Sequence, residues 1–384
     1  MRVLLEQKSI PMIKLNNKSD KYIFLVLLIF IIINISFYLF QKRDYFIQPF
    51  DMEKYDVIYE HSQYNVGKNE FVEYIDDPEL YSLAGIKYIR FEDPSTINFE
   101  LQPLTKYLFG LSILIFKNAI IIQIIIGLLL LFITFKISSC IFPYKSLSII
   151  PSLLLSIDLL FKEQLVRSYL DLFQTLSIQT CFLFIFLSLK NLKYLPVVSV
   201  LLGIIALSKS FFVGLIVYIT LLVYILLIKR KIIRKFLVNS VWSVLVYFFG
   251  YIIFFLNHDL KDFVLLHINI IKLYRSYVPE YPKGEIFRII ISGKWKKWYD
   301  DFSYKNVSTW SILWPAGLLS TLASIYLNFI KKNEYIALFL LWISFYLISI
   351  SFKLVFPRYL LPVLPNLYII FAYVVFNLYK KIKV

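Results

Sequence analysis

The residues best suited to chemistry lie in an acidic stretch between positions 51 and 100. This stretch holds 12 of the chain's 25 Asp and Glu residues. A carboxylate can take the proton of a hydroxyl group, so the cluster offers candidate general bases. Asp76 and Asp77 are the leading candidates because they directly precede Pro78, a residue that favours the first turn of a helix. For most of the other acidic residues, a solvated loop is the alternative interpretation.

A helix is predicted to begin just after Asp77, with Asp77 as its N-cap and Pro78 in its first position. One face of that helix would carry the apolar residues Leu80, Leu83, Ala84 and Tyr88. The acidic pair would then lie at a helix N-terminus on the membrane surface. An acidic cap with a purely structural role remains the alternative at this point.

A second group of candidates consists of charged residues at breaks in apolar runs. Lys209 and Arg358 are such residues, and Asp171 opens another run. A cation at bilayer depth costs roughly 2.5–3.5 kcal/mol on insertion scales, so it usually has a partner. In a dry site, fixed cations stabilise an anionic leaving group such as a phosphate. The alternatives are snorkelling for Lys209, an interfacial anchor for Arg358, and pairing with Arg167 for Asp171.

The elements that must position these residues are transmembrane helices. Of the 384 residues, 59% are hydrophobic, against about 45–50% in soluble domains, and the mean hydropathy is +0.71. This excludes a soluble enzyme, a disordered chain and a fibrous protein. The predicted class is an all-α polytopic membrane protein. Its apolar runs lie at 22–41, 103–116, 119–138, 147–160, 172–189, 194–209, 211–228, 236–256, 311–330, 335–352 and 358–379.

The basic residues predict the topology. The net charge is +16, and Lys and Arg gather in the N-terminal tail and in short loops at 190–193, 229–235 and 331–332. This pattern indicates cytoplasmic loops and does not require nucleic acid as a partner. Placing all of these loops inside requires an even number of crossings. Run 103–116 is too short to cross alone, so we expect ten crossings within a range of ten to twelve helices.

A single membrane domain, 1–384, is expected. Its parts are a cytoplasmic tail (1–21), a first transmembrane helix that is an uncleaved anchor (22–41), a first outer loop with the acidic site (42–102), a transmembrane bundle (103–256), a second outer loop (257–310), C-terminal transmembrane helices (311–379) and a cytoplasmic tail (380–384). Residues 259–275 are predicted to form an interfacial helix. Trp295 and Trp298 are typical of an aromatic belt.

Four short motifs, in order between about 70 and 370, resemble the GT-C class of membrane glycosyltransferases, especially the branch of protein O-mannosyltransferases and lipid A aminoarabinose transferases. The first outer loop carries "DDPELYSLAG" and "INFELQPLTKYL", and the later motifs are "LVRSYLDLF", "LLGIIALSKSFF" and "FPRYLLP". Two departures stand out. The family's His-Pro-Pro is Leu101-Gln102-Pro103 here, and its Asp-Glu pair is Asp-Asp-Pro. The register between Asp76 and Asp77 therefore stays open, and the spacing to Tyr81 favours Asp77.

The resemblance implies an enzyme that transfers a mannose-like hexose or a modified pentose from a polyprenyl-phosphate carrier. The acceptor would be a hydroxyl or phosphate on protein, lipid or glycan at the outer face of the cell membrane, and a single displacement would invert the anomeric carbon. By the same resemblance Asp77 or Asp76 is the base. Donor or acceptor would contact Glu100, Asp171, Tyr81 and Lys106. The lipid phosphate would contact Lys209, Arg358, Tyr359 and Arg167.

No soluble cofactor and no metal ligand set is assigned. His61, His258 and His267 lack the short spacing of metal ligands, and a divalent metal bound with Glu100 is left open without support. Besides the carrier and acceptor, the expected partners are membrane lipids. Two other functions stay open. A transporter or flippase of a lipid-linked saccharide would often show paired repeats, which this sequence lacks. An inactive assembly subunit is kept open by the altered His-Pro-Pro.

Overall fold

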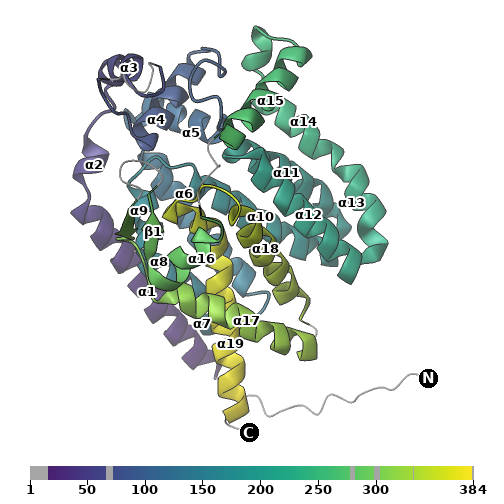
Figure 1. Ribbon diagram of the computed structural model, residues 1–384. Coiled ribbons are helices and arrows are strands. Elements are labelled where there is room, and N and C mark those ends of the chain that lie inside the picture. The colour runs from purple at the N-terminus through teal and green to yellow at the C-terminus, as the bar shows by residue number, and fades with distance from the viewer. Residues whose placement is uncertain (1–15, 66–71, 277–281, 298–302, 332, 383–384) are drawn as a thin grey trace.

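The protein is a bundle of helices with parts of two long loops gathered at one end (Figure 1). The computed structural model describes residues 16–65, 72–276, 282–297, 303–331 and 333–382; Trp298 lies outside them. Within these ranges, six helical segments are long and apolar enough to cross a membrane: Asn17–Gln41, Ile121–Ser138, Asp171–Lys190, Phe211–Ile228, Arg230–Gly250 and Pro357–Lys380. Shorter apolar helices cover the remaining predicted runs, so this is a multi-pass membrane protein.

Every predicted apolar run is helical, but runs 147–160 and 236–256 are each divided among three helical pieces. The helices of the bundle are α1 (Asn17–Gln41), α5 (Leu104–Phe116), α6 (Ile121–Ser138), α7 (Lys145–Ser148), α8 (Ile150–Ile157), α9 (Leu159–Leu165), α10 (Asp171–Lys190), α11 (Leu195–Ser208), α12 (Phe211–Ile228), α13 (Ile233–Asn239), α14 (Val241–Gly250), α17 (Leu313–Lys331), α18 (Glu334–Ile350), the 3₁₀ helix η4 (Pro357–Val363) and α19 (Leu364–Ile382). Short 3₁₀ turns are η1 (Leu192–Tyr194), η2 (Arg230–Ile232) and η3 (Phe254–Leu256).

The two long loops carry the remaining elements. The first long loop (42–102) contains α2 (Asp44–Ile47), α3 (Met52–Glu60) and α4 (Asp77–Ile89). The second long loop (257–310) contains α15 (Leu260–Ser276), α16 (Glu285–Ser292) and the antiparallel hairpin of β1 (Lys294–Lys296) and β2 (Tyr304–Asn306). The interfacial helix predicted at 259–275 is present as α15, and it buries Phe263, Leu266 and Ile270. The hairpin was not predicted. We call the end of the bundle that carries α3, α4 and α15 the loop end.

Helix α5 begins and ends at the loop end. At its start, Thr105 donates a hydrogen bond to the carbonyl of Ser208 (2.5 Å). Just past its end, the side chain of Asn118 donates to the carbonyl of Tyr45 (2.8 Å), which lies beyond the last turn of α1. Its 13 residues span ~20 Å, short of a hydrocarbon core of ~30 Å. Run 103–116 therefore does not cross alone, as its length predicts.

Helix α4 begins one residue earlier than predicted. Asp76 is its N-cap and Asp77 its first residue, so the prediction of Asp77 as the cap is wrong. The reason is that Asp76 has the extended backbone of a cap, although its side chain makes no capping hydrogen bond. As a consequence, the Asp77 side chain belongs to the first helical turn. The four residues predicted to share a face, Leu80, Leu83, Ala84 and Tyr88, are all buried.

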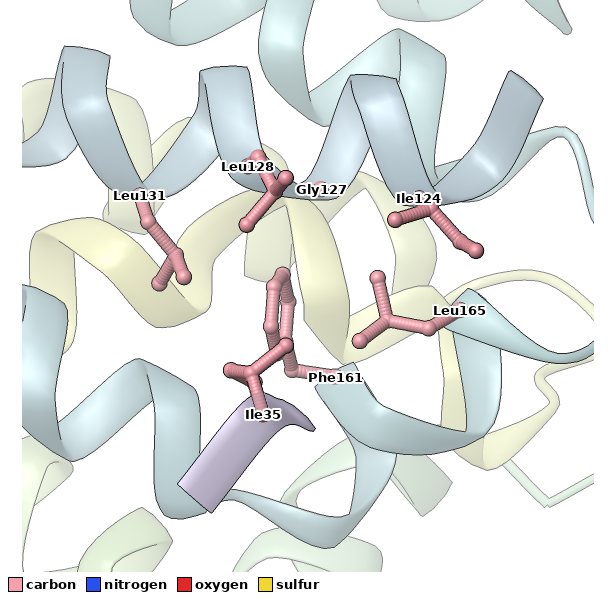
Figure 2. Close-up of a pocket in the computed structure, with 7 residues that line it drawn as sticks. All are labelled: Ile35, Ile124, Gly127, Leu128, Leu131, Phe161 and Leu165. Carbon is pink, nitrogen blue, oxygen red and sulfur yellow. The ribbon is translucent and has the colours of Figure 1, made fainter. Parts of the chain in front are cut away.

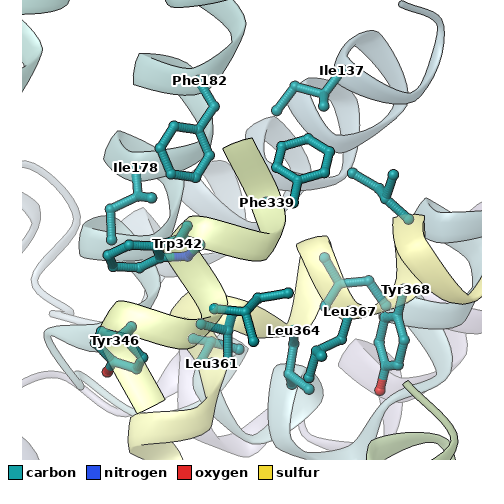
Figure 3. Packing of buried hydrophobic residues seen from close by; sticks show 14 of the residues in the cluster. Ile137, Ile178, Phe182, Phe339, Trp342, Tyr346, Leu361, Leu364, Leu367 and Tyr368 are labelled. Atoms are coloured by element: carbon teal, nitrogen blue, oxygen red, sulfur yellow. The ribbon is translucent and has the colours of Figure 1, made fainter. Parts of the chain in front are cut away.

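The largest apolar core surrounds η4. Trp342 and Tyr346 of α18 and Phe182 of α10 pack against Leu361 and the start of α19 (Figure 3). The rings of Phe182 and Trp342 meet edge to face at 5.8 Å. Tyr346 donates a hydrogen bond to the carbonyl of Tyr359 (2.8 Å), and Trp342 donates to that of Pro362 (3.3 Å). This core fixes the backbone on which Arg358 and Tyr359 stand.

Helix α1 lies at the side of the bundle, where only Ile31 and Ile35 are buried. Ile35 faces a small apolar depression between α6 and α9 (Figure 2). Its other lining residues include Gly127 and Leu165, and the space leaves no room for a water molecule. This depression is a packing contact and offers no polar group to a ligand.

Helices α4 and α5 cross at two glycines. A Cβ atom on Gly85 would lie 2.2 Å from the carbonyl oxygen of Lys106, and one on Gly110 would lie 2.2 Å from that of Gly85. Both obstacles are backbone atoms, so neither can move unless the helices separate. Glycine at these two positions is therefore what allows α4 to lie directly on α5.

Replacing Gly85 with Ala is expected to force α4 away from α5 and to destabilise the protein by about 1–3 kcal/mol, the usual cost of overpacking. The measurement is thermal unfolding of the purified protein in detergent. Gly127→Ala is the matched control, because its Cβ would meet the movable end of the Leu165 side chain, at 2.2 Å. Equal melting temperatures for the two variants would contradict the close-packing argument.

The two long loops are joined by an ion pair. Nε2 of His258 lies 2.5 Å from the carboxylate of Asp93, and Nδ1 lies 3.5 Å from that of Asp262. The hydrogen bond to Asp93 raises the pKa of His258 above its usual 6.5. Burial disfavours the charge on Asp93, but hydrogen bonds from Ser95 and His258 outweigh it and lower the pKa of Asp93 below its usual 3.8. Both shifts favour the charged pair.

The stabilisation from this pair is expected to depend on pH at both ends. The His258 contribution is full below pH 6.5 and is lost as the pH rises through its raised pKa. The Asp93 contribution is full above pH 3.8 and is lost as the pH falls through its lowered pKa. The melting temperature of wild type minus that of His258→Gln, measured from about pH 5 to about pH 9, should therefore shrink as the pH rises. A difference that does not change with pH would refute this.

Candidate functional site

Four charged side chains from four different elements meet at the loop end. They are Asp77 in the first turn of α4, Asp171 at the start of α10, Lys209 at the end of α11 and Arg358 in η4. Lys209 Nζ lies 2.5 Å from Asp171 Oδ1, and Arg358 Nε lies 3.6 Å from Asp171 Oδ2. Arg358 also donates through Nη2 to Asp77 Oδ2. We call these residues the charged quartet; two positive and two negative charges make it neutral.

The members of the quartet differ in exposure. The Asp77 side chain is 25% exposed, against 12% for Arg358 and 2% for Asp171. A buried charge needs a partner, because breaking one buried pair typically costs about 3–5 kcal/mol. Asp171 therefore serves as the inner counterion of both cations, while Asp77 is the carboxylate that a substrate can reach. The alternative pairing of Asp171 with Arg167 is not the one found here.

The guanidinium of Arg358 lies between aromatic rings. Its Cζ is 4.6 Å from the centre of the Tyr169 ring and 4.5 Å from that of Phe356. Tyr169 precedes α10 and is itself held by a hydrogen bond from Gln123 to its carbonyl (2.8 Å). Stacking on aromatic faces suits a planar guanidinium and fixes the direction of its donors. The two rings thus aim Arg358 at Asp77.

Lys209 is held from the first long loop. The backbone N–H of Gln102 donates to the carbonyl of Lys209 (3.3 Å), next to the bond from Thr105 to Ser208. The ammonium group of Lys209 lies 4.0 Å from the centre of the Tyr359 ring. Through this bond Gln102 anchors the backbone that carries Lys209.

A pair of serines ties α4 to the segment before α10. Ser168 donates to the carbonyl of Pro78 (2.8 Å), and its hydroxyl lies 2.8 Å from that of Ser82. Ser82 also bonds the Pro78 carbonyl (2.7 Å). Since Pro78 follows Asp77 and Ser168 lies three residues before Asp171, these bonds set the distance between the two carboxylates of the quartet.

Other predicted site residues lie around the quartet. Tyr81 is buried one turn after Asp77 on α4. Glu100 accepts a hydrogen bond from the side chain of Asn98 (2.5 Å), and burial raises its pKa. Lys106 points away from the quartet into the loop, where it donates to the carbonyls of Asn98 and Leu101. Lys106 thereby holds the loop segment that carries Glu100.

Arg167 lies in a second charged group beside the quartet. Burial raises the pKa of Glu79 in the first long loop, and the charge of Arg167 opposes that rise; the charge of Arg167 also acts on Glu163. The charge of Arg358 also acts on Glu163. Asp76 is exposed at the N-cap of α4, and its charge acts on Glu79. Arg167 therefore borders the quartet without being one of its four members.

The described residues gather no group of three or more His, Cys, Asp and Glu side chains able to hold a metal ion. The carboxylates of Asp77 and Asp171 are already bound to cations, so the donor set there does not fit a metal. A separate open cavity of about 260 Å³ lies beside His258, between the two long loops. Phe99, Phe254 and Asn269 are among the residues that line it.

Sequence reasoning missed the aromatic residues that orient Arg358. Tyr169 and Phe356 flank a cation that was predicted, but nothing in their spacing tells which ring will face it. A signal was available in "SYLD" and "FPRY", since each places an aromatic residue within two positions of a predicted charged residue. Arg–aromatic contacts are common enough in proteins to justify that expectation.

No protein-family model and no curated protein sequence matches this chain. Solved structures do match it. ArnT from Cupriavidus metallidurans bound to undecaprenyl phosphate aligns with a TM-score of 0.58 at 14% identity, covering 79% of this chain and 56% of that one. The oligosaccharyltransferase of Archaeoglobus fulgidus in complex with Zn and sulfate gives a TM-score of 0.54 at 15% identity, covering 79% and 46%.

The oligosaccharyltransferase AglB from the same archaeon, in complex with an inhibitory peptide and a dolichol-phosphate, gives 0.51 at 14% identity, covering 80% and 48%. This chain spans about half the length of the structures that it matches. At such identities the likeness concerns the fold. All of these structures are GT-C glycosyltransferases, and the chain accordingly has a GT-C-like membrane fold.

Proposed function

We propose that this protein is a glycosyltransferase that moves a sugar from a polyprenyl-phosphate carrier to a hydroxyl or phosphate acceptor. The observation that carries the proposal is the ion pair of Arg358 with Asp77, which supports Asp77 as a base next to cations that would bind the phosphate. The fold is consistent with it, since ArnT and AglB were crystallised with undecaprenyl phosphate and a dolichol-phosphate. The sugar would be a mannose-like hexose or a modified pentose.

In the proposed reaction with a hydroxyl acceptor, the acceptor oxygen attacks the anomeric carbon while Asp77 takes its proton. The bond between that carbon and the phosphate oxygen breaks, and its electron pair leaves with the lipid phosphate. Lys209 and Arg358 stabilise the charge of the departing phosphate through charge-assisted hydrogen bonds. A single displacement of this kind needs one base and inverts the anomeric carbon.

Around this centre we propose supporting roles for the remaining residues. Tyr81, Glu100 and Asp171 would orient the donor or acceptor, Tyr359 would line the phosphate site, and Arg167 would extend its positive potential. Lys106 would act through the loop that it holds. The site would face the outside of the cell membrane, because the basic short loops favour the cytoplasm. The partners would be membrane lipids, the lipid-linked sugar and an acceptor on protein, lipid or glycan.

Transfer should depend on Asp77 and hardly on its neighbour. With the protein purified into lipid, a panel of radiolabelled polyprenyl-phosphate monosaccharides as donors, and membranes and peptides as acceptors, Asp77→Asn is expected to lower kcat by about 10²–10⁴. Asp76→Asn is the matched control. It should stay near wild type because Asp76 is exposed and its side chain forms no capping bond.

If both variants transfer sugar as well as wild type, the assignment of the base fails. If only Asp76→Asn loses activity, the base is Asp76 and not Asp77. No transfer by wild type from any donor, together with saturable binding of the carrier, would favour a transporter or an inactive subunit. Melting temperatures measured alongside separate lost chemistry from lost folding.

Carrier binding should depend on Lys209. Removing this cation alone would leave the buried Asp171 with only the longer contact to Arg358 (3.6 Å), so the test uses the neutral double variant Lys209→Met with Asp171→Asn. Binding of undecaprenyl phosphate should weaken about tenfold or more, as expected when a charge-assisted hydrogen bond is lost. Lys353→Met is the control for lost charge alone, since Lys353 lies nearby over the Phe212 ring, outside the quartet. Wild-type affinity in the double variant would remove Lys209 from the phosphate site.

A further inference from the structure

The second long loop grips the backbone segment that leads into Arg358. At one end of this segment, the N–H of Gly284 donates to the carbonyl of Ser351 (2.9 Å). At the other end, the indole N–H of Trp295 donates to the carbonyl of Val355 (2.8 Å). Val355 is fully buried and lies three residues before Arg358. The hairpin of the second long loop is therefore hydrogen-bonded directly to the backbone segment that precedes Arg358.

The same tryptophan supports one wall of the Arg358 site. The ring of Trp295 packs against that of Phe356 at 5.6 Å, with 37° between their planes. Phe356 in turn lies 4.5 Å from the Arg358 guanidinium and 5.6 Å from the Tyr359 ring. The opposite wall, Tyr169, is fixed from α6 through Gln123. One wall thus belongs to the helical bundle, and the other rests on the second long loop.

Trp295 is itself held rigidly. The carboxylate of Glu285 accepts a hydrogen bond from the backbone N–H of Lys296 (2.9 Å), beside Trp295 in β1. Gly293, which ends α16 just before β1, has φ +64°, and a Cβ there would lie 2.7 Å from the Trp310 ring. Trp310 donates its indole N–H to the carbonyl of Ile290 (2.9 Å), which lies in α16. The backbone that carries Trp295 is therefore fixed by contacts within the second long loop.

We propose that Trp295 is a positioning residue for Arg358, acting through the Val355 carbonyl and the Phe356 ring. The catalytic meaning of this rests on the function proposed above, in which Arg358 binds the carrier phosphate and meets Asp77. The second long loop then sets the direction of Arg358, and so links the hairpin to the carboxylate on the first long loop. An interfacial anchor, the role predicted for this tryptophan from sequence, would have no such link.

The kinetic test compares two matched tryptophans. Trp295→Phe removes the hydrogen bond to the Val355 carbonyl but keeps an aromatic ring. Trp310→Phe removes the same kind of bond, from the indole to the Ile290 carbonyl. Transfer by Trp295→Phe is expected to fall about three- to tenfold, the rate equivalent of one lost hydrogen bond. In an Arg358→Lys background the same change should add little, because residues that act through one another are not additive. Trp310→Phe should act equally in both backgrounds.

Equal losses for Trp295→Phe with and without Arg358→Lys would overturn the proposal, since a purely structural effect is additive. A second readout does not need transferase activity. Phenylglyoxal modification of each arginine, followed by mass spectrometry, reports how tightly its guanidinium is held. The Arg358 side chain is 12% exposed, whereas that of Arg288 is 49% exposed and provides the internal reference.

Trp295→Ala is expected to speed modification of Arg358 relative to Arg288 about threefold or more, because it removes both the hydrogen bond and the ring behind Phe356. Trp310→Phe should leave that ratio unchanged. An unchanged ratio in Trp295→Ala would overturn the proposal whether or not the protein transfers sugar. If wild type shows no transfer, the proposed function fails, while the modification ratio still decides the link from Trp295 to Arg358.

Discussion

The ion pair between Arg358 and Asp77 is the contact on which the geometry of the loop end depends. It joins residues 281 positions apart, and each belongs to an element with its own supports. Arg358 stands on η4, which the Trp342 core fixes, and Asp77 stands on α4, which lies against α5. The other two charges accompany this pair. Asp171 is a second counterion for Arg358, and Lys209 neutralises the charge that Asp171 adds. A displacement of α4 or of η4 would therefore leave charge unpaired at the loop end.

The first long loop is built to prevent such a displacement. Close contact of α4 with α5 at Gly85 and Gly110 leaves no room for sliding, since the obstructing atoms are backbone. Ser82 and Ser168 bond the turn after Asp77 to the segment before Asp171. These are ordinary hydrogen bonds, each worth about 1 kcal/mol net, but they act on backbone groups next to the charged residues. These short local contacts thus fix the positions of the two carboxylates before the ion pairs form.

Helices and the identity of the charged residues could be predicted from sequence, whereas their pairing could not. Apolar runs of 18 or more residues leave few alternatives to a membrane helix, and a charge at the break of such a run, such as Lys209, is conspicuous. Which charge meets which depends on how helix ends assemble in space, and that information is spread over the whole chain. The cap of α4 was misplaced by one residue because Asp76 and Asp77 are chemically alike. Trp295 was predicted as a belt residue because an indole is amphipathic both at a lipid interface and against a buried carbonyl.

On the proposed function, the neutrality of the charged quartet couples carrier binding to base activation. A lipid phosphate brings at least one further negative charge, and the nearby cations are already neutralised by Asp77 and Asp171. The inner pair cannot be given up cheaply, because Asp171 is almost fully buried. Arg358 is the cation that can exchange Asp77 for the phosphate while its guanidinium stays against the two rings, since Asp77 is the most exposed member and can be solvated or bind the acceptor. Asp77 then loses its guanidinium partner as the carrier arrives, and its oxygen becomes available for the acceptor proton. The order of events follows from burial: the exposed pair exchanges partners while the buried pair holds the site together.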